Sequence, residues 1–332
     1  MMFKDKLIDT GDKNPSLLGG QIMNRAELKG LIQGIPATIP TPFDDNYRLD
    51  LAKMTDLTRW WVASGLGTST SPLKVAAAMG EGPELSEDEW PHLLKTVVDA
   101  AGSDANIMCA LKPKNTLLTI EDAKRAQDLG AIGLQIDLPF FHHPNQDDIV
   151  RFFTDISDAI DIGIMIYNTF WFGFDDMSLQ ADTALRLTDA EHVVAIKWNV
   201  PSSQDYDDMC KFSKTFNVID NSGQAVRCHK NGGRGIISGM AAVYPAHPLK
   251  VWELLEQEKY DEAQVEIDQA KNAMASWGEK YSKRSGGYWQ VKAYMAAMGR
   301  PVGPPRPPTI GATEEMIQEM RNIFVGMGWP VI

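Results

Sequence analysis

The stretch IMCALKPKNTLLTIEDAKRAQDLGAIGLQI, residues 107–136, contains one complete strand–helix–strand unit. Its two ends, 107–111 and 132–136, are short apolar runs, as expected for parallel strands that are covered on both faces. The segment between them, 119–129, has the mixed polar and apolar pattern of an amphipathic helix. The same unit recurs along the chain, and for this reason the stretch decides the fold.

Eight such apolar runs follow one another from about residue 34, and helical segments separate them. Eight strand–helix repeats with short connections predict an α/β fold, a (β/α)8 TIM barrel. A doubly wound open sheet is the alternative, but it usually has a Gly-rich phosphate turn where this chain has IPATIPTPF, residues 35–43. The predicted strands are 35–39, 73–78, 107–111, 132–136, 163–167, 193–197, 217–219 and 235–238.

The helical segments fall into two groups. Those between the strands are predicted at 51–64, 86–101, 119–129, 145–160, 179–187, 203–215 and 223–231. The segment 86–101 opens with Ser86 followed by Glu89, the spacing of a capping box. Helices at 248–257, 260–277, 288–298 and 314–326 follow the last strand. We therefore expect an N-terminal extension (1–27), a barrel (28–245) and a C-terminal helical region (246–332).

Composition and charge exclude several kinds of protein. The chain has 32 Lys and Arg against 44 Asp and Glu, a net charge of −12, which argues against nucleic acid or an anionic membrane surface as a partner. No apolar stretch approaches the ~20 residues of a membrane span. The N-terminus lacks the apolar core of a secretory signal. Cys109, Cys210 and Cys228 form no CxxC pair, as expected for reduced thiols in a cytoplasmic protein.

In a barrel of this kind, polar residues at the C-terminal ends of the strands face the active site. Lys197 ends the run Val-Val-Ala-Ile-Lys, which should be buried on both sides. Burial lowers the pKa of an amine and frees it to attack a carbonyl carbon. The alternative is a lysine that extends to the barrel rim or pairs with a carboxylate there. The position alone favours neither interpretation.

Other strand ends supply further candidates. Tyr167 ends the preceding strand, where its hydroxyl could exchange protons with a group bound to Lys197, although a packed ring is the alternative. Lys112 ends the third strand and is a second candidate amine, or more simply a positive group near an anionic substrate. Asp137 and Glu81 have no His or carboxylate partner at metal-ligand spacing, and we expect no metal.

These residues resemble the Schiff-base pyruvate aldolase superfamily of dihydrodipicolinate synthase and N-acetylneuraminate lyase. Within it, the chain is most similar to the hydratase-aldolases that cleave benzylidenepyruvates. The resemblance covers about residues 28–308, and its specificity comes from the order and spacing of the motifs. They are PTPF at 40–43, GE at 80–81, NT at 115–116, YN at 167–168, AIK at 195–197, GIIS at 235–238, Lys292, and GPPRPP at 303–308.

The resemblance implies a class I lyase. Lys197 would form an imine with pyruvate or another 2-oxo acid, an aldehyde would be the second partner, and Tyr167 would relay protons. No organic cofactor is implied, because the lysine imine is the electron sink. A homotetramer is expected from the same resemblance. The resemblance implies that Ala78, Met79, Gly80 and Ser238 bind the pyruvate carboxylate. We also expect the strand-end residues Asn168 and Lys112 to contact the substrate.

The chain also departs from the family pattern. AAM at 77–79 replaces a segment that usually contains a threonine, and FF at 140–141 replaces a tyrosine pair. Both changes remove hydroxyls and argue against a lysine-biosynthesis synthase. The aromatic loop containing Trp171, together with Trp198, predicts an aromatic or apolar aldehyde, although packing within the barrel or at an interface is the alternative for each ring. The alternatives are an imine-dependent dehydratase, decarboxylase or hydrolase, or a non-catalytic protein that binds a 2-oxo acid.

Overall fold

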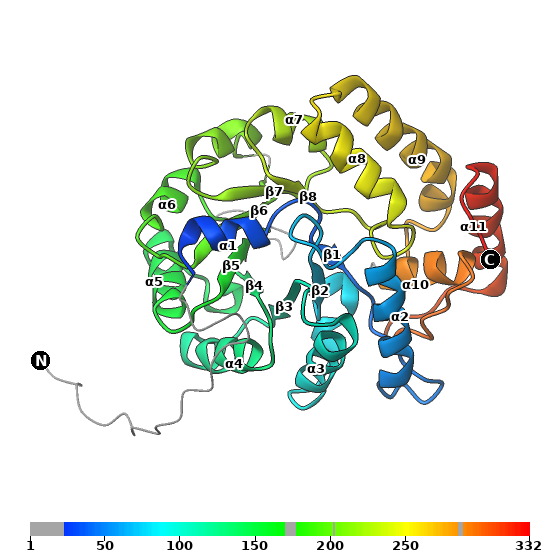
Figure 1. The fold of residues 1–332 in the computed structure, drawn as a ribbon, viewed down its shortest axis with the longest axis horizontal. Helices are drawn as coiled ribbons and strands as arrows, with labels where there is room; N and C mark the ends of the chain where they lie inside the picture. Colours follow the sequence, from blue (N-terminus) through cyan, green and yellow to red (C-terminus); the bar gives the residue numbers. More distant parts are fainter. Residues whose placement is uncertain (1–22, 170–176, 202, 285–287) are drawn as a thin grey trace, which may run out of the picture.

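The computed structural model describes residues 23–169, 177–201, 203–284 and 288–332. Eight parallel strands form one sheet in chain order, and the predicted (β/α)8 barrel is confirmed (Figure 1). The sheet closes where Gly34, just before the first strand, forms a parallel bridge with Gly235 of the last strand. The strands are β1 (Ala37–Thr38), β2 (Leu73–Val75), β3 (Ile107–Leu111), β4 (Gly133–Asp137), β5 (Gly163–Tyr167), β6 (Val193–Trp198), β7 (Asn217–Asp220) and β8 (Gly235–Ile236).

Helices surround the sheet, and several of them begin at polar residues that cap them. The Asn145 side chain accepts hydrogen bonds from the N–H groups of Asp147 and Asp148, and an N-cap carboxamide of this kind satisfies backbone donors that would otherwise lack partners. The surrounding helices are α2 (Leu51–Ala63), α3 (Glu89–Ala101), α4 (Thr116–Asp128), α5 (Gln146–Ser157), α6 (Ala181–Arg186) and α7 (Ala225–Lys230).

Several predicted helices differ in their bounds from those observed, and three of them differ for a clear reason. The helix α4 begins at Thr116 rather than at 119, because Asn115 caps it. The predicted capping box does form, since Ser86 and Glu89 exchange hydrogen bonds, but α3 itself begins only at Glu89. The helix predicted at 203–215 is wrong as an α-helix, because that region contains the 3-10 helix η5 (Tyr206–Lys211).

One helix was not predicted. The helix α1 (Arg25–Leu31) lies in front of β5 and β6 in Figure 1 and overlaps the expected N-terminal extension. Leu28 and the following Ile32 are fully buried against apolar side chains inside the barrel. The Ile32 side chain occupies the space beside Gly133 and Gly163, where an added Cβ would lie 2.4 Å and 2.6 Å from the Ile32 Cδ1 atom. This end of the barrel is therefore filled by side chains.

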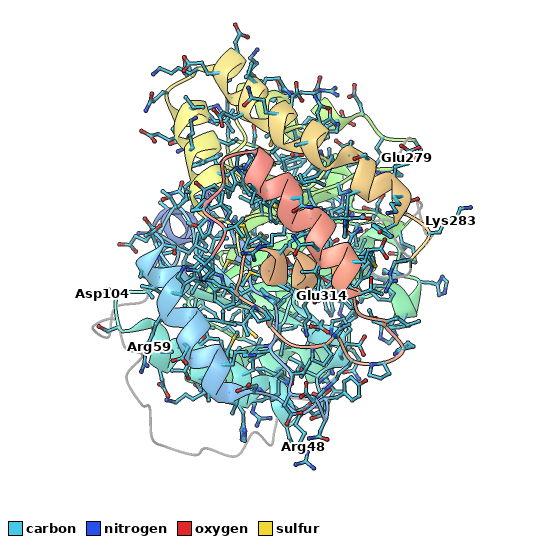
Figure 2. All side chains as sticks on the ribbon, turned by 90° about the vertical axis from the view of Figure 1, so that its right-hand side faces the viewer. Arg48, Arg59, Asp104, Glu279, Lys283 and Glu314 are labelled. Carbon is cyan, nitrogen blue, oxygen red and sulfur yellow. The ribbon has the colours of Figure 1, made fainter. Side chains whose placement is uncertain are left out.

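The four C-terminal helices pack beside the barrel. Figure 2, viewed from their side, shows α11 across α10, which it contacts. Aromatic rings join them, with the Trp277 ring 5.3 Å from that of Trp289 and the Tyr294 ring 6.0 Å from that of Phe324. Among the described residues, no helix has the length and apolar character needed to cross a membrane. The four helices are α8 (Ala246–Glu256), α9 (Tyr260–Lys280), α10 (Tyr288–Ala297) and α11 (Glu314–Gly326).

Candidate active site

Three ionisable residues stand side by side at the C-terminal ends of neighbouring strands. Asp137 on β4 is the register partner of Tyr167 on β5, which is in turn the partner of Lys197 on β6. Side chains alternate along a strand, and the flanking Ile166 and Ile196 pack outward into the core beneath the helices. The three polar side chains consequently face the interior of the barrel.

Lys197 is buried, with 7% of its surface exposed. Its Nζ lies 3.5 Å from the centroid of the Tyr167 ring, so the amine contacts the ring face. Burial lowers the pKa of Lys197 to about 8, and the negative charge of Asp137 opposes this shift. Among the described residues, the amine has no hydrogen bond or ion pair, unlike a lysine that pairs at the rim. The Lys197 amine is accordingly available to react.

Tyr167 is positioned to hold and pass a proton. Burial raises the pKa of its hydroxyl, so the phenol stays protonated, and the Asp137 charge adds to this effect. Hydrogen bonds with Thr169 and Asn221 oppose the rise. The hydroxyl therefore lies next to one polar group just after its own strand and to another after β7. Thr169 supplies a hydroxyl close to the site, although the sequence has none at 77–79.

A second lysine lies in the barrel and was not predicted. Lys74, in the middle of β2, is fully buried, and its Nζ donates to the Gln135 Oε1 atom at 2.9 Å. Burial and the charge of Lys197 hold the pKa of Lys74 well below its usual range. Burial also raises the pKa of Asp137 to about 6, against the charges of Lys197 and Lys74 and a hydrogen bond from Gln135. The sequence does contain a sign of this buried lysine, because Lys74, like Lys197, stands in an apolar strand.

The turn after β2 offers backbone donors to the mouth of the barrel. It forms the 3-10 helix η1 (Ala78–Gly80), and the Gly80 N–H is already bonded to the Ala77 carbonyl. In the described part of the chain, no acceptor is found for the N–H groups of Ala78 and Met79. A Cβ on Gly80 would lie 2.5 Å from the Ile39 carbonyl oxygen, so this close approach requires glycine. Two of the three expected anion-binding amides are thus free.

A buried ion pair fixes this turn to the C-terminal region. Glu81 follows the turn with a positive φ of 61°, and its Oε2 lies 2.6 Å from the Lys292 Nζ. Lys292 also donates to the Pro304 carbonyl at 2.7 Å, and the Arg306 N–H donates to the other Glu81 oxygen at 3.3 Å. The Arg306 guanidinium binds both oxygens of Glu89. The Lys292 and GPPRPP motifs therefore support the wall of the site.

Three expected substrate-binding residues already have protein partners. The Asn168 side chain bonds to the backbone of Leu179, accepting from its N–H at 2.8 Å. The Lys112 ammonium donates to the Leu85 carbonyl and lies 3.7 Å from a Glu87 oxygen. Lys112 consequently has a counter-charge of its own. The third residue, the half-buried Ser238, accepts a hydrogen bond from the Met240 N–H.

Trp198 does not lie where the sequence-based prediction put it. The strand alternation that turns Lys197 inward turns Trp198 outward, where its indole N–H donates to the Tyr206 carbonyl and its ring packs against Phe212. The prediction that Trp198 lines the substrate site is therefore wrong. Trp171 lies outside the described residues. Among those residues, no group of three or more His, Cys, Asp or Glu is arranged to hold a metal ion.

Comparisons with known proteins show which family and fold the chain is similar to. The sequence profile of the dihydrodipicolinate synthetase family matches residues 31–325. The 4-hydroxy-tetrahydrodipicolinate synthase of Heliobacterium modesticaldum is 26% identical over 87% of this chain and 93% of its own length. A protein of the same name from Halalkalibacterium halodurans is 32% identical, over 49% of this chain and 53% of the relative.

Solved structures show the same fold. The dihydrodipicolinate synthase of Thermotoga maritima matches with a TM-score of 0.77 and 23% identity, over 90% of this chain and 99% of that one. A prophage protein of the dihydrodipicolinic acid synthase family from E. coli K12, solved in complex with pyruvate, matches with a TM-score of 0.78 and 18% identity, over the same shares. At these identities the likeness concerns the fold alone.

Proposed function

Because the chain belongs to the dihydrodipicolinate synthetase family, we propose that it is a Schiff-base-forming lyase, a class I aldolase that acts on a 2-oxo acid with pyruvate as one partner. The observation that carries the proposal is the buried, unpaired amine of Lys197 against the ring of Tyr167. An amine whose pKa burial lowers to about 8 has an uncharged, nucleophilic fraction near neutral pH.

The reaction needs no group beyond these side chains and water. The Lys197 amine attacks the C2 carbonyl carbon, and the resulting carbinolamine takes up a proton and loses water to leave an iminium. In the cleavage direction the C4 hydroxyl loses its proton, the C3–C4 bond breaks, and its electron pair moves to the iminium nitrogen as an enamine forms. Aldehyde leaves, C3 takes up a proton, and water hydrolyses the imine to release pyruvate and the free amine.

Two sets of groups are assigned to hold and protonate the substrate. The free N–H groups of Ala78 and Met79 are proposed to bind the pyruvate carboxylate, with Ser238 near it, since preorganised amides suit an anion without a charged partner. Tyr167 is proposed to move protons at the carbinolamine oxygen and the C4 hydroxyl. Its hydrogen bond with Thr169 supplies the second hydroxyl of that relay.

The second substrate is proposed to be an aromatic or apolar aldehyde, as in the hydratase-aldolase branch. Two features support this assignment. Phe141, after β4, is 73% exposed where a tyrosine pair would offer hydroxyls. The GPPRPP segment, which resembles that branch, is anchored through Lys292 to the turn at Glu81. A cytoplasmic homotetramer without an organic cofactor remains our expectation.

Borohydride trapping tests the imine. Pyruvate and borohydride should add one reduced three-carbon unit to the protein, and peptide mapping should locate it on Lys197. The Lys197→Met variant should lose the adduct, while Lys112→Met should retain it, because Lys112 is occupied by Leu85 and Glu87. An unmodified wild-type protein under conditions that trap a known aldolase would refute the proposed function.

A second candidate is another imine reaction on the same lysine, such as dehydration or decarboxylation. The absence of side-chain hydroxyls at 77–79 and 140–141 favours it, because an aldol relay in this family uses them. An assay with pyruvate and a panel of aromatic aldehydes separates the two. Trapping without any aldol or retro-aldol product would support the second candidate.

A further inference from the structure

The turn after β2 is held in an uncommon backbone conformation. Ala76 and Glu81, at its two ends, both have positive φ angles, 58° and 61°, which residues other than glycine rarely adopt. Such residues persist only where the surrounding structure fixes them, and they gather at functional sites. Between them lie Ala78 and Met79, whose free N–H groups are assigned to the pyruvate carboxylate. The contacts that fix Glu81 therefore also fix the direction of these donors.

The Glu81 side chain is held at both of its carboxylate oxygens. The Lys292 Nζ lies 2.6 Å from Oε2, and the Arg306 N–H donates to Oε1 at 3.3 Å. Lys292 is itself fixed by a second hydrogen bond, of 2.7 Å, to the Pro304 carbonyl. The helix α10, which carries Lys292, also contacts the 3-10 helix η1 of the turn. The C-terminal region thus binds the turn directly.

The Lys292 and Arg306 side chains also contact the loop after β1. The Lys292 Nζ and the Arg306 Cζ lie 4.5 Å and 4.2 Å from the centroid of the Phe43 ring. In the same loop, the fully buried Thr41 hydroxyl donates to the Gly80 carbonyl at 2.5 Å. The turn is consequently fixed by the loop after β1 and by the C-terminal region together.

Stability alone does not account for a buried ion pair at this place. Glu81 and Lys292 are almost fully buried, and taking two charges out of water costs about as much as their attraction returns. Apolar side chains of similar volume often fill such a space with no loss of stability. An ion pair, however, fixes two side chains in one geometry, and Glu81 directly follows η1 in the chain. The pair therefore constrains the backbone that carries the free N–H groups.

We propose that Lys292 is a positioning residue for the 2-oxo acid: through its ion pair with Glu81, it holds the turn in the conformation that directs the two free N–H groups at the substrate carboxylate. The inference rests on the proposed function, because it concerns how the same substrate is bound. Lys292 itself does not bind the substrate, since Glu81 and Pro304 occupy its amine. Its loss should therefore weaken the preference for ketones that carry a carboxylate.

The test compares the trapping of pyruvate with that of acetone, a ketone that has no carboxylate. Second-order rates of reductive trapping by cyanoborohydride are measured for both ketones, and peptide mapping locates the label on Lys197. The wild-type protein should prefer pyruvate. In Lys292→Met this preference, the ratio of the two rates, should fall about tenfold, which is the effect of losing roughly one charge-assisted hydrogen bond.

Two control variants separate positioning from damage to the fold. The double variant Glu81→Gln with Lys292→Met buries no uncompensated charge and should regain most of the stability. It still lacks the ion pair, so it should keep the low preference of the single variant. Trp277→Phe loses the buried hydrogen bond to the Met316 carbonyl in the same C-terminal helices, and it should keep the wild-type preference.

The possible outcomes distinguish this role from the proposed function. A double variant that regains both stability and preference overturns the positioning role, because lost stability would then explain the defect. An equal fall in both rates in Lys292→Met, or an unchanged preference, also overturns it. These results leave the imine chemistry of Lys197 intact. A wild-type protein that traps neither ketone refutes the proposed function, and the role of Lys292 with it.

Discussion

The buried ion pair between Glu81 and Lys292 gives the sharpest stability prediction. The two side chains are only 1% and 4% exposed, and 2.6 Å separates the Glu81 Oε2 and Lys292 Nζ atoms. Lys292→Met keeps the volume of the side chain and leaves Glu81 buried with one hydrogen bond, the 3.3 Å bond from the Arg306 N–H. Removing one partner of such a pair costs about 3–5 kcal/mol, because the remaining charge stays desolvated.

Urea unfolding followed by circular dichroism measures this cost. The matched control is the double variant Glu81→Gln with Lys292→Met, which buries no uncompensated charge and should regain most of the loss. The sign of the pH dependence follows from Glu81. Burial raises its pKa above the ordinary 4.5, so the native state holds a proton that the unfolded state releases, and the cost should grow as pH rises above 4.5.

Two results would refute this reasoning. If the single and double variants lose the same free energy of unfolding, the uncompensated charge is not the cause. If the cost of Lys292→Met is the same at acidic and alkaline pH, Glu81 does not carry that charge. In either case the pair would act through packing alone.

Three further predictions follow from other contacts. Trp198→Phe should lower the free energy of unfolding by about 1–3 kcal/mol, because the hydrogen bond to the Tyr206 carbonyl is lost. It should not slow pyruvate trapping, and a slower reaction would mean that Trp198 does contribute to the site. Arg306 holds the pKa of Glu89 at about 2, so the contribution of this pair to the stability of the fold is present above pH 4.5 and is lost toward pH 2. The melting temperature of Glu89→Gln should therefore fall less steeply with acid than that of the wild-type protein, and an equal fall would contradict the prediction. Gly80→Ala places a Cβ 2.5 Å from the Ile39 carbonyl oxygen and should weaken pyruvate binding in a trapping titration; unchanged binding would argue against the turn.

The strand pattern predicted most of the barrel because buried parallel strands are continuous apolar runs. The runs at 107–111 and 163–167 match β3 and β5 residue for residue. The helix α1 escaped prediction because it is short and its neighbouring N-terminal sequence is polar, yet Leu28 and Ile32 find their partners inside the barrel. These contacts join residues that are far apart in the sequence and are brought together only when the strands close into a barrel.

The candidate site was predictable where a polar residue ended an apolar strand. Lys197 and Tyr167 were found in this way, and their adjacency follows from the register of β5 and β6. Lys74 carried the same signal in the interior of β2 rather than at its end, and was missed. The orientation of Trp198 was misjudged because alternation along β6 assigns neighbouring residues to opposite faces.

The side chains of Leu28 and Ile32 fill one end of the barrel interior, so this end is closed. Substrate and products of the proposed reaction would then enter and leave through one opening, at the ends of the strands that carry Tyr167 and Lys197. In the proposed reaction, the fragment bound to Lys197 would lie deeper in the barrel than the aldehyde, which would lie nearer the opening. Under the proposed function, the aldehyde should therefore leave first and pyruvate last. Steady-state product inhibition should show this order, and a random pattern would mean that a side exit exists.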